Sequence, residues 1–326
     1  MASLQRARLD RALAPLRADV LRFAAGIGLL ERLAHGPARP EAVRRALRLS
    51  RRGLAGLLAV LVAEGLVRRS RGRIALVPGA RLPRARPGTY ANPWLPAALR
   101  SEGPVRADRI AAWEKGQDLP DAADSTARMD ALSSGVAPEL ARRWPVPRAR
   151  RLLDVAGGSG VLSCAIARRH HGLRVTLADL PAVCRAANTF VARRRLGGRV
   201  GFAPLDMFRD EWPAGHDAIL FGNIFHDWED ARCLRLACRA FRALPPGGSV
   251  VLHEMLLDED GGPLSVALFS LTMFAATRGR QRTGRQLSDL LLAAGFREAK
   301  VLPAGGYFSL VWARKPKPKM KRQPSP

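Results

Sequence analysis

Cysteine is scarce in this chain, and the few cysteines are not arranged for cross-linking or for zinc binding. The residues are Cys164, Cys184, Cys233 and Cys238, which form no C-x-x-C pair. All four fall in segments with helical spacing, whereas disulfide frameworks and structural zinc sites use clustered cysteines. We therefore expect four reduced thiols in or near the core, and no metal cofactor.

Long apolar runs are also missing. Although 47% of the residues are hydrophobic, no stretch of 18 or more uncharged apolar residues occurs, so no transmembrane helix is predicted. The first twenty residues lack the continuous apolar segment of a secretory signal. The expected location is therefore the cytoplasm, without a membrane partner, and the length of 326 residues suggests about two domains.

Acidic residues are few relative to basic ones. The chain has 54 lysines and arginines against 28 aspartates and glutamates, which gives a formal net charge of +26. Such a charge is typical of proteins that bind polyanions. The arginines are spread over every segment, however, and aromatic residues do not interleave with them. Nucleic acid is therefore not the expected partner.

The chain is organised around the stretch 152–160, LLDVAGGSG. Its apolar run is typical of a buried parallel strand, and the residues after it have helical spacing. Gly157, Gly158 and Gly160 permit positive φ and the close approach of a ligand, while the helix start offers unpaired N–H groups. This strand, turn and helix are the predicted docking point for a nucleotide.

The neighbouring residues favour S-adenosylmethionine over NAD. Ser163 replaces the third glycine of the dinucleotide fingerprint, and no lysine-bearing phosphate loop is present. The next strand ends in Asp179, a carboxylate placed to accept hydrogen bonds from two ribose hydroxyls, which both cofactors carry. Asp154 precedes the glycines and suits a cationic amino-acid moiety better than a pyrophosphate.

From residue 150 onward, strands and helices alternate, which predicts an α/β fold with a mostly parallel sheet covered on both faces. Gly305 and Gly306 predict an antiparallel hairpin between the last two strands, and therefore one reversed strand. Ligands of such sheets bind beyond the carboxyl ends of the strands. The five candidate parallel strands are residues 150–156, 173–180, 199–207, 216–224 and 247–255, and their ends carry Asp179, Asp206, His226 and Glu254.

Residues 1 to about 90 read as short helices followed by a hairpin at Gly72, a winged-helix arrangement. Ser50 caps the helix that a DNA-binding protein would place in the major groove, and Arg51 and Arg52 lie in its first turn. A DNA-binding regulator with a ligand-sensing α/β domain is therefore an alternative. The other interpretation is that this helix packs on a neighbouring element or on a second subunit. For the second case we expect a homodimer in which apolar residues are partly buried between subunits, among them Leu57, Leu58, Leu61 and Leu66.

The segment from about 91 to 148 is rich in proline, glycine and arginine and reads as a helical linker. Helices in this position commonly cover a substrate cleft, which makes Trp113, Met129 and Trp144 candidates for contact with substrate. Each of the three, taken singly, is more typical of an ordinary core residue.

Several motifs together resemble the small-molecule O-methyltransferases, in particular the caffeic acid O-methyltransferase type and its bacterial relatives in polyketide, carotenoid and other natural-product pathways. The motifs are LLDVAGGSG at 152–160, DLP at 179–181, DMF at 206–208, HDW at 226–228, PPGG at 245–248 and HEM at 253–255. The resemblance spans about residues 20–313. It implies a winged-helix-like dimerisation domain (1–90), a linker contributing to the substrate cleft (91–148), a Rossmann-like class I methyltransferase domain with a seven-stranded sheet (149–314) and a basic tail (315–326), which we expect to be disordered.

The resemblance also assigns roles to residues. His226 would be the general base that takes the proton from a substrate hydroxyl, and Glu254 would lie beside it. The cofactor S-adenosylmethionine would be bound by Asp154, Gly157, Gly158, Gly160, Asp179, Leu180, Asp206 and Met207. The acceptor would be bound by residues of 265–279, namely Leu268, Leu271, Thr272 and Phe274, together with Trp113 and Met129.

Two positions depart from the family pattern. Gly222 stands where the plant enzymes usually carry a lysine, and Gln281 falls where a second catalytic carboxylate is expected. An amide can orient the histidine ring or the substrate but adds no negative charge. The predicted activity is methyl transfer to a hydroxyl of a bulky small molecule. Methylation of carbon or nitrogen, or another reaction on the same fold, remains the alternative within this class.

Overall fold

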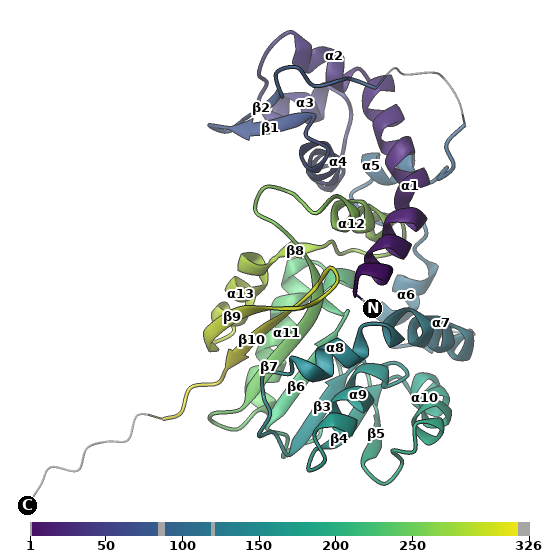
Figure 1. Ribbon diagram of the computed structural model, residues 1–326, viewed down its shortest axis with the longest axis vertical. Coiled ribbons are helices and arrows are strands. Elements are labelled where there is room, and N and C mark those ends of the chain that lie inside the picture. The colour runs from purple at the N-terminus through teal and green to yellow at the C-terminus, as the bar shows by residue number, and fades with distance from the viewer. Residues whose placement is uncertain (1, 84–88, 119–120, 319–326) are drawn as a thin grey trace, which may run out of the picture. The chain divides into compact units, whose positions relative to one another are not determined.

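The computed structural model describes residues 2–83, 89–118 and 121–318 (Figure 1). Two compact units interleave along the chain. The first comprises Met1–Lys115, His226–Glu229 and Met255–Gly284, and the second comprises Gly116–Phe225, Asp230–Glu254 and Arg285–Pro326. This division differs from the boundaries predicted near residues 90 and 149, because Met255–Gly284 packs with the N-terminal residues. The predicted disordered tail lies outside the described residues from 319 onward.

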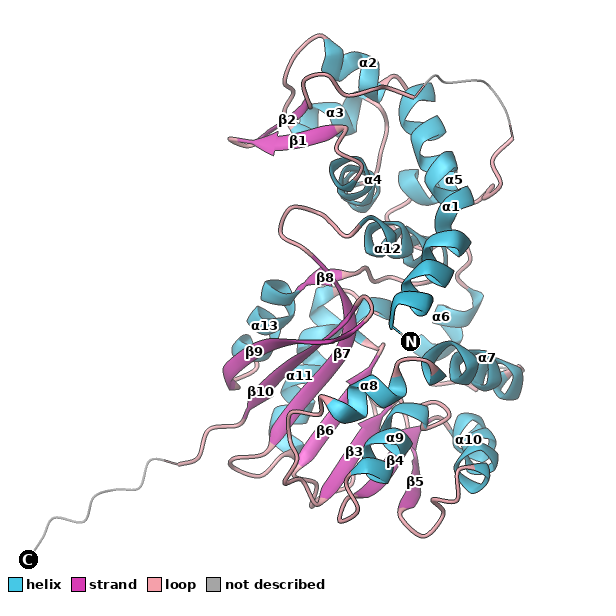
Figure 2. Ribbon diagram, in the orientation of Figure 1, coloured by secondary structure: helices cyan, strands magenta, loops and turns pink. Residues whose placement is uncertain are grey.

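The first unit is mainly helical (Figure 2). Ser50 caps α4 as predicted, since its Oγ accepts the Gly53 N–H at 2.8 Å. The hairpin β1–β2 is antiparallel, with Gly72 in its turn and Ile74 buried, which confirms the winged-helix arrangement. The elements are α1 (Ala2–Gly26), α2 (Leu29–Ala34), α3 (Pro40–Ala46), α4 (Arg51–Ala63), β1 (Val67–Ser70), β2 (Arg73–Leu76), α5 (Leu95–Arg100), α6 (Asp108–Glu114), α12 (Leu264–Ala276) and β8 (Arg282–Thr283).

Helix α4 packs against α12, and a glycine makes the contact possible. A Cβ added to Gly56 would lie 2.6 Å from side-chain carbons of Leu271 and Phe274, which is closer than any real contact. This packing buries the apolar side of α4 within one chain, as seen for Leu57, Leu58 and Leu61, and Leu66, which follows the helix, is buried as well. The prediction that these leucines are partly buried between subunits is therefore wrong, because α12, distant in sequence, helps to cover them.

The same packing leaves α4 poorly equipped to read DNA. Its exposed residues are Arg51 and Ala55, and Arg52 is half-buried. Sequence-specific helices present several polar side chains to base edges in the major groove. The geometry of α4 therefore favours a packing role over the DNA-reading role of the regulator alternative.

The second unit contains the sheet, in the order β5-β4-β3-β6-β7-β10-β9. The five predicted parallel strands are confirmed, and β9 and β10 form the predicted antiparallel hairpin, with φ of 93° at Gly305 and 59° at Gly306. The strands are β3 (Arg151–Val155), β4 (Arg174–Asp179), β5 (Val200–Pro204), β6 (Ala218–Gly222), β7 (Ser249–Leu257), β9 (Arg297–Gly305) and β10 (Phe308–Arg314). The helices are α7 (Ala122–Ser134), α8 (Ala137–Arg142), α9 (Val161–Arg169), α10 (Pro181–Arg193), α11 (Asp230–Ala243) and α13 (Gly284–Ala293).

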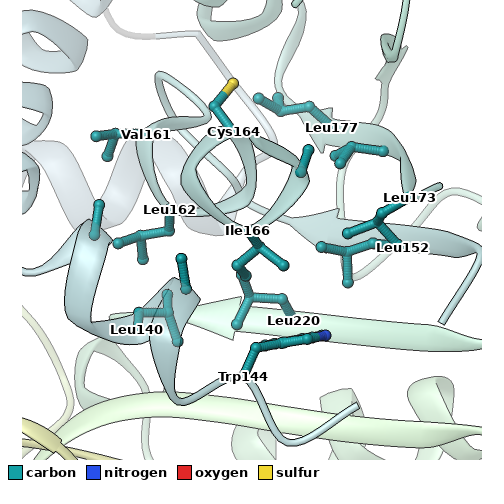
Figure 3. Packing of buried hydrophobic residues seen from close by; sticks show 14 of the residues in the cluster. Leu140, Trp144, Leu152, Val161, Leu162, Cys164, Ile166, Leu173, Leu177 and Leu220 are labelled. Carbon is teal, nitrogen blue, oxygen red and sulfur yellow. The ribbon is translucent and has the colours of Figure 1, made fainter. Parts of the chain in front are cut away.

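The core of this unit lies where α8 and α9 meet the sheet (Figure 3). Ile166 of α9 packs among Leu152, Leu220 and Trp144, whose indole N–H donates to the Val146 carbonyl at 2.9 Å. Trp144 is therefore a core residue, which was the more typical of the two interpretations of this side chain. The four cysteines are free thiols, three buried and one half-buried, as predicted. Within the described ranges, no helix has the length and apolar character needed to span a membrane.

Candidate active site

The turn between β3 and α9 brings a buried carboxylate against glycine backbone. Gly158 and Gly160 have positive φ, as predicted. A Cβ at Gly157 would lie 2.7 Å from Oδ2 of Asp154, so only glycine lets the turn pass this side chain. Asp154 is 2% exposed, and its Oδ2 has no hydrogen-bond partner among the residues that the structure describes. Burial raises the pKa of Asp154 to about 7, opposed by a hydrogen bond from Ser163.

Asp179 is held by backbone at the end of β4. Its Oδ2 accepts the Gly158 N–H at 2.9 Å, and its Oδ1 accepts the Leu180 N–H at 2.8 Å. Burial raises the pKa of Asp179 to about 6. A carboxylate has about four lone-pair directions, so two remain for hydroxyl donors. Asp179, Leu180 and the glycine turn are therefore held together by these two hydrogen bonds.

Asp206 follows β5. Its Oδ1 accepts a hydrogen bond from the Phe208 N–H at 2.7 Å, and its Oδ2 accepts one from Arg209 Nη1 at 3.0 Å. The adjacent Met207 is half-buried. Both residues lie just beyond the carboxyl end of β5, whose last residue pairs with Asp179. This placement agrees with a role for Asp206 and Met207 beside the same ligand.

The linker contributes two residues to this edge that the sequence analysis missed. Asp118 Oδ1 accepts the Ala182 N–H at the start of α10, at 2.9 Å. A Cβ on Gly116 would lie 2.5 Å from Oδ2 of Asp206, so the linker backbone passes directly over this carboxylate. Charged residues are common in loops, so Asp118 gave no distinctive signal. For Gly116 the residue type itself was the signal, because glycine permits the positive φ that the structure shows there.

His226 lies in the 3-10 turn η1 (Phe225–Asp227), which follows β6. Its Nε2 lies 3.8 Å from Oδ1 of Asp227, and its ring stands edge-on to that of Phe269, with centroids 6.2 Å apart. A carboxylate at that distance stabilises the positive charge that an imidazole acquires with a proton. The sequence analysis included neither Asp227 nor Phe269 in the site.

Glu254 and Gln281 are both buried. Glu254 Oε1 accepts the Phe225 N–H at 2.8 Å and so anchors the residue that precedes the histidine. The backbone N–H of Gln281 donates to Ser270 Oγ at 3.0 Å, while its side-chain Nε2 finds no partner within the described part of the chain. Glu254 thus supports the turn that carries His226, whereas Gln281 keeps a side-chain donor that no described residue accepts.

The predicted acceptor residues separate into buried and accessible ones. Leu268, Leu271 and Phe274 are buried in the core of the first unit, whereas Thr272 on the other side of α12 is partly exposed. Phe269 and Met273 share that partly exposed side. Trp113 is half-buried on α6, and Met129 is 50% exposed on α7.

Gly222, which stands in place of the plant lysine, has little room for a side chain. A Cβ there would lie 2.5 Å from Cδ1 of Leu162. A lysine would therefore require Leu162 to adopt another rotamer.

Comparison with known proteins addresses the family. A profile for the O-methyltransferase domain matches residues 113–297. The 3-hydroxy-5-methyl-1-naphthoate 3-O-methyltransferase of Streptomyces sahachiroi is 34% identical over 309 residues, which cover 88% of each chain. The chain belongs to the O-methyltransferase family. Among solved structures, an O-methyltransferase family 2 protein of Planctomyces limnophilus in complex with apigenin has a TM-score of 0.79 and 26% identity over 95% of both chains. Human N-acetylserotonin methyltransferase in complex with S-adenosylmethionine has the same fold, with a TM-score of 0.60 and 24% identity over 94% of this chain and 96% of that one.

The enzyme is therefore an S-adenosylmethionine-dependent O-methyltransferase, and its second unit fits that cofactor. The unpartnered oxygen of buried Asp154 suits a cationic group. The glycine turn leaves space that a Cβ would fill, and Asp179 keeps acceptor capacity for ribose hydroxyls. When bound, S-adenosylmethionine supplies a methyl group on a positively charged sulfur.

The raised pKa values of Asp154 and Asp179 predict pH-dependent cofactor affinity. With pKa values raised to about 7 for Asp154 and about 6 for Asp179, the protonated fraction of each carboxyl increases as the pH falls through its pKa. A cation and ribose hydroxyl donors both favour the ionised form, so binding must then release protons. We expect the Kd for S-adenosylmethionine to fall as pH rises from 5 to 7.5 and then to level off, as measured by calorimetry. Asp154→Asn should flatten the part of this dependence near pH 7, whereas exposed Asp289→Asn should leave it unchanged.

Proposed function

We propose that this O-methyltransferase methylates a hydroxyl of a bulky, largely apolar aromatic or polyketide-like acceptor, with His226 as the general base. The observation that carries this proposal is the environment of His226, which combines a carboxylate at 3.8 Å with the ring of Phe269. A titratable base beside an apolar surface suits an aromatic compound whose hydroxyl must lose its proton.

The base acts by removing one proton. S-adenosylmethionine would supply the methyl group and keep the electron pair of its carbon–sulfur bond, while His226 takes the proton that the acceptor hydroxyl loses as its oxygen is methylated. Asp227 stabilises the resulting imidazolium, and Glu254 keeps the turn in place through the Phe225 N–H. Gln281 offers its unpartnered Nε2 donor to an oxygen atom of the acceptor. Proximity and one positioned base are sufficient for a methyl transfer of this kind.

The partly exposed side of α12 supports the proposed acceptor class. Phe269, Thr272 and Met273 present an aromatic ring, a hydroxyl and a thioether, a combination typical of sites for flat, mostly apolar ligands. The relatives whose names specify a hydroxynaphthoate or N-acetylserotonin act on bicyclic aromatic compounds. Trp113 and Met129 are further candidates for contact with the acceptor, through partly exposed apolar surface.

The test is methyl transfer from radiolabelled S-adenosylmethionine to three matched bicyclic acceptors: a hydroxynaphthoate, its amino analogue and its methyl ether. We expect a radiolabelled methyl ether to form from the hydroxynaphthoate and no labelled product to form from the other two compounds. Transfer to the amino analogue at an equal rate would contradict oxygen specificity, and transfer to the ether would indicate methylation of carbon.

A homodimer is proposed on the family resemblance of the first domain alone. The leucines of α4 do not support it, because the chain itself buries them. A subunit interface would therefore have to use surfaces other than these leucines.

A further inference from the structure

Arg52, in the first turn of α4, is tied to a segment more than 220 positions later in the chain. Its Nη2 donates to the carbonyl of Thr277 at 3.2 Å and to the carbonyl of Gly279 at 3.1 Å. Its guanidinium carbon lies 4.2 Å from the centroid of the Phe274 ring. Burial lowers the pKa of Arg52 to about 10, so the group stays charged at neutral pH. These contacts offset the cost of placing a charged group in a half-buried position.

The segment that Arg52 holds lies directly against the turn that carries His226. A Cβ on Gly279 would lie 2.0 Å from the His226 carbonyl oxygen and 2.5 Å from the Trp228 nitrogen. Buried Arg282, at the other end of the segment, donates from Nη2 to the Trp228 carbonyl at 2.7 Å. The backbone around the histidine is therefore supported by residues 277–282.

We propose that Arg52 is a positioning residue for His226. By fixing the carbonyls of Thr277 and Gly279, it holds Gly279 against the 226–228 backbone and so sets the place of the imidazole. This inference rests on the proposed role of His226 as general base. A DNA-binding interpretation would place Arg52 in the major groove. The proposal instead gives Arg52 a role inside the enzyme.

The test compares Arg52→Met with Arg51→Met, which removes the neighbouring exposed arginine of the same helix turn. Turnover is measured with a hydroxynaphthoate whose hydroxyl is un-ionised at the assay pH and with a nitro-substituted analogue that is already ionised. For Arg52→Met we expect roughly a tenfold to hundredfold lower kcat on the first acceptor, as small displacements of reacting groups produce. The ionised acceptor should lose less than about threefold, because it needs no base. Arg52→Lys should recover part of the loss, since an ammonium group can also donate to two carbonyls.

Two results would overturn the proposal. In the first, Arg52→Met has the same kcat as Arg51→Met on both acceptors. In the second, Arg52→Met loses kcat by the same factor on both acceptors. The second result would mean that Arg52 supports the fold or the acceptor site rather than the base. If His226→Ala itself retained turnover on the un-ionised acceptor, the proposed function would fail instead, so the two failures are distinguishable.

A second variant tests the same support without changing a charge. Gly279→Ala should reproduce the selective loss by displacing the His226 backbone. Gly103→Ala is the control, because the nearest atom to a Cβ there, Arg278 Nη1, is 3.9 Å away. An equal loss on both acceptors for Gly279→Ala, with an unchanged melting temperature, would also contradict the positioning role.

Discussion

His226→Ala should lower turnover by about 10² to 10⁴ on an acceptor with an un-ionised hydroxyl, the usual contribution of a general base. The affinity for S-adenosylmethionine should stay close to that of the unsubstituted enzyme, because the predicted cofactor contacts lie on other residues. Steady-state kinetics with saturating cofactor measure the first quantity, and calorimetry measures the second.

The matched control is His171→Ala, which removes an exposed imidazole and leaves in place the backbone carbonyl that accepts a hydrogen bond from Arg199. It should leave both quantities unchanged. A His226→Ala enzyme that loses cofactor affinity in proportion to turnover would point to a binding role for this residue instead of a proton-transfer role.

Asp179→Ala should weaken S-adenosylmethionine binding by about 1 to 3 kcal/mol, the cost of leaving polar groups unpaired. The substitution removes the acceptor for ribose hydroxyls and also leaves the N–H groups of Gly158 and Leu180 without their partner. In Kd the expected loss is roughly 5- to 150-fold, measured by calorimetry at pH 8, where Asp179 is ionised.

Asp289→Ala, on the exposed side of α13, serves as the control for the loss of one carboxylate. NAD should bind neither variant nor the unsubstituted enzyme. Unchanged S-adenosylmethionine affinity in Asp179→Ala, with the fold intact by circular dichroism, would contradict the placement of the ribose at this carboxylate.

Local signals in the sequence were sufficient to predict the structural features that depend only on residues close to one another in the chain. Ser50 caps a helix because its side chain reaches an N–H three residues later, and the Gly305–Gly306 turn closes a hairpin because both residues adopt positive φ. The positions of Asp154 and Asp179 near the carboxyl ends of β3 and β4 were predictable, because the ends of parallel strands place side chains at one known edge of the sheet. These inferences need no knowledge of distant contacts.

The features that depend on contacts between distant segments could not be predicted in this way. The hydrophobic residues of α12 occur on more than one side, so periodicity did not reveal that Leu268 and Leu271 face the core while Phe269 and Thr272 keep exposed surface. The hydrogen bond that the Ala182 N–H donates to Asp118 Oδ1 joins residues 64 positions apart in the chain. A sequence pattern does not indicate which residue of a linker loop will contact the first turn of which helix.

The dependence of the His226→Ala defect on acceptor ionisation tests the central claim most directly. The ratio of kcat between the unsubstituted enzyme and His226→Ala is measured on a hydroxynaphthoate and on its nitro-substituted, pre-ionised analogue. Proton removal by His226 predicts a ratio of about 10² or more on the first acceptor and below about tenfold on the second. Equal ratios on the two acceptors would contradict the role of His226 as the general base.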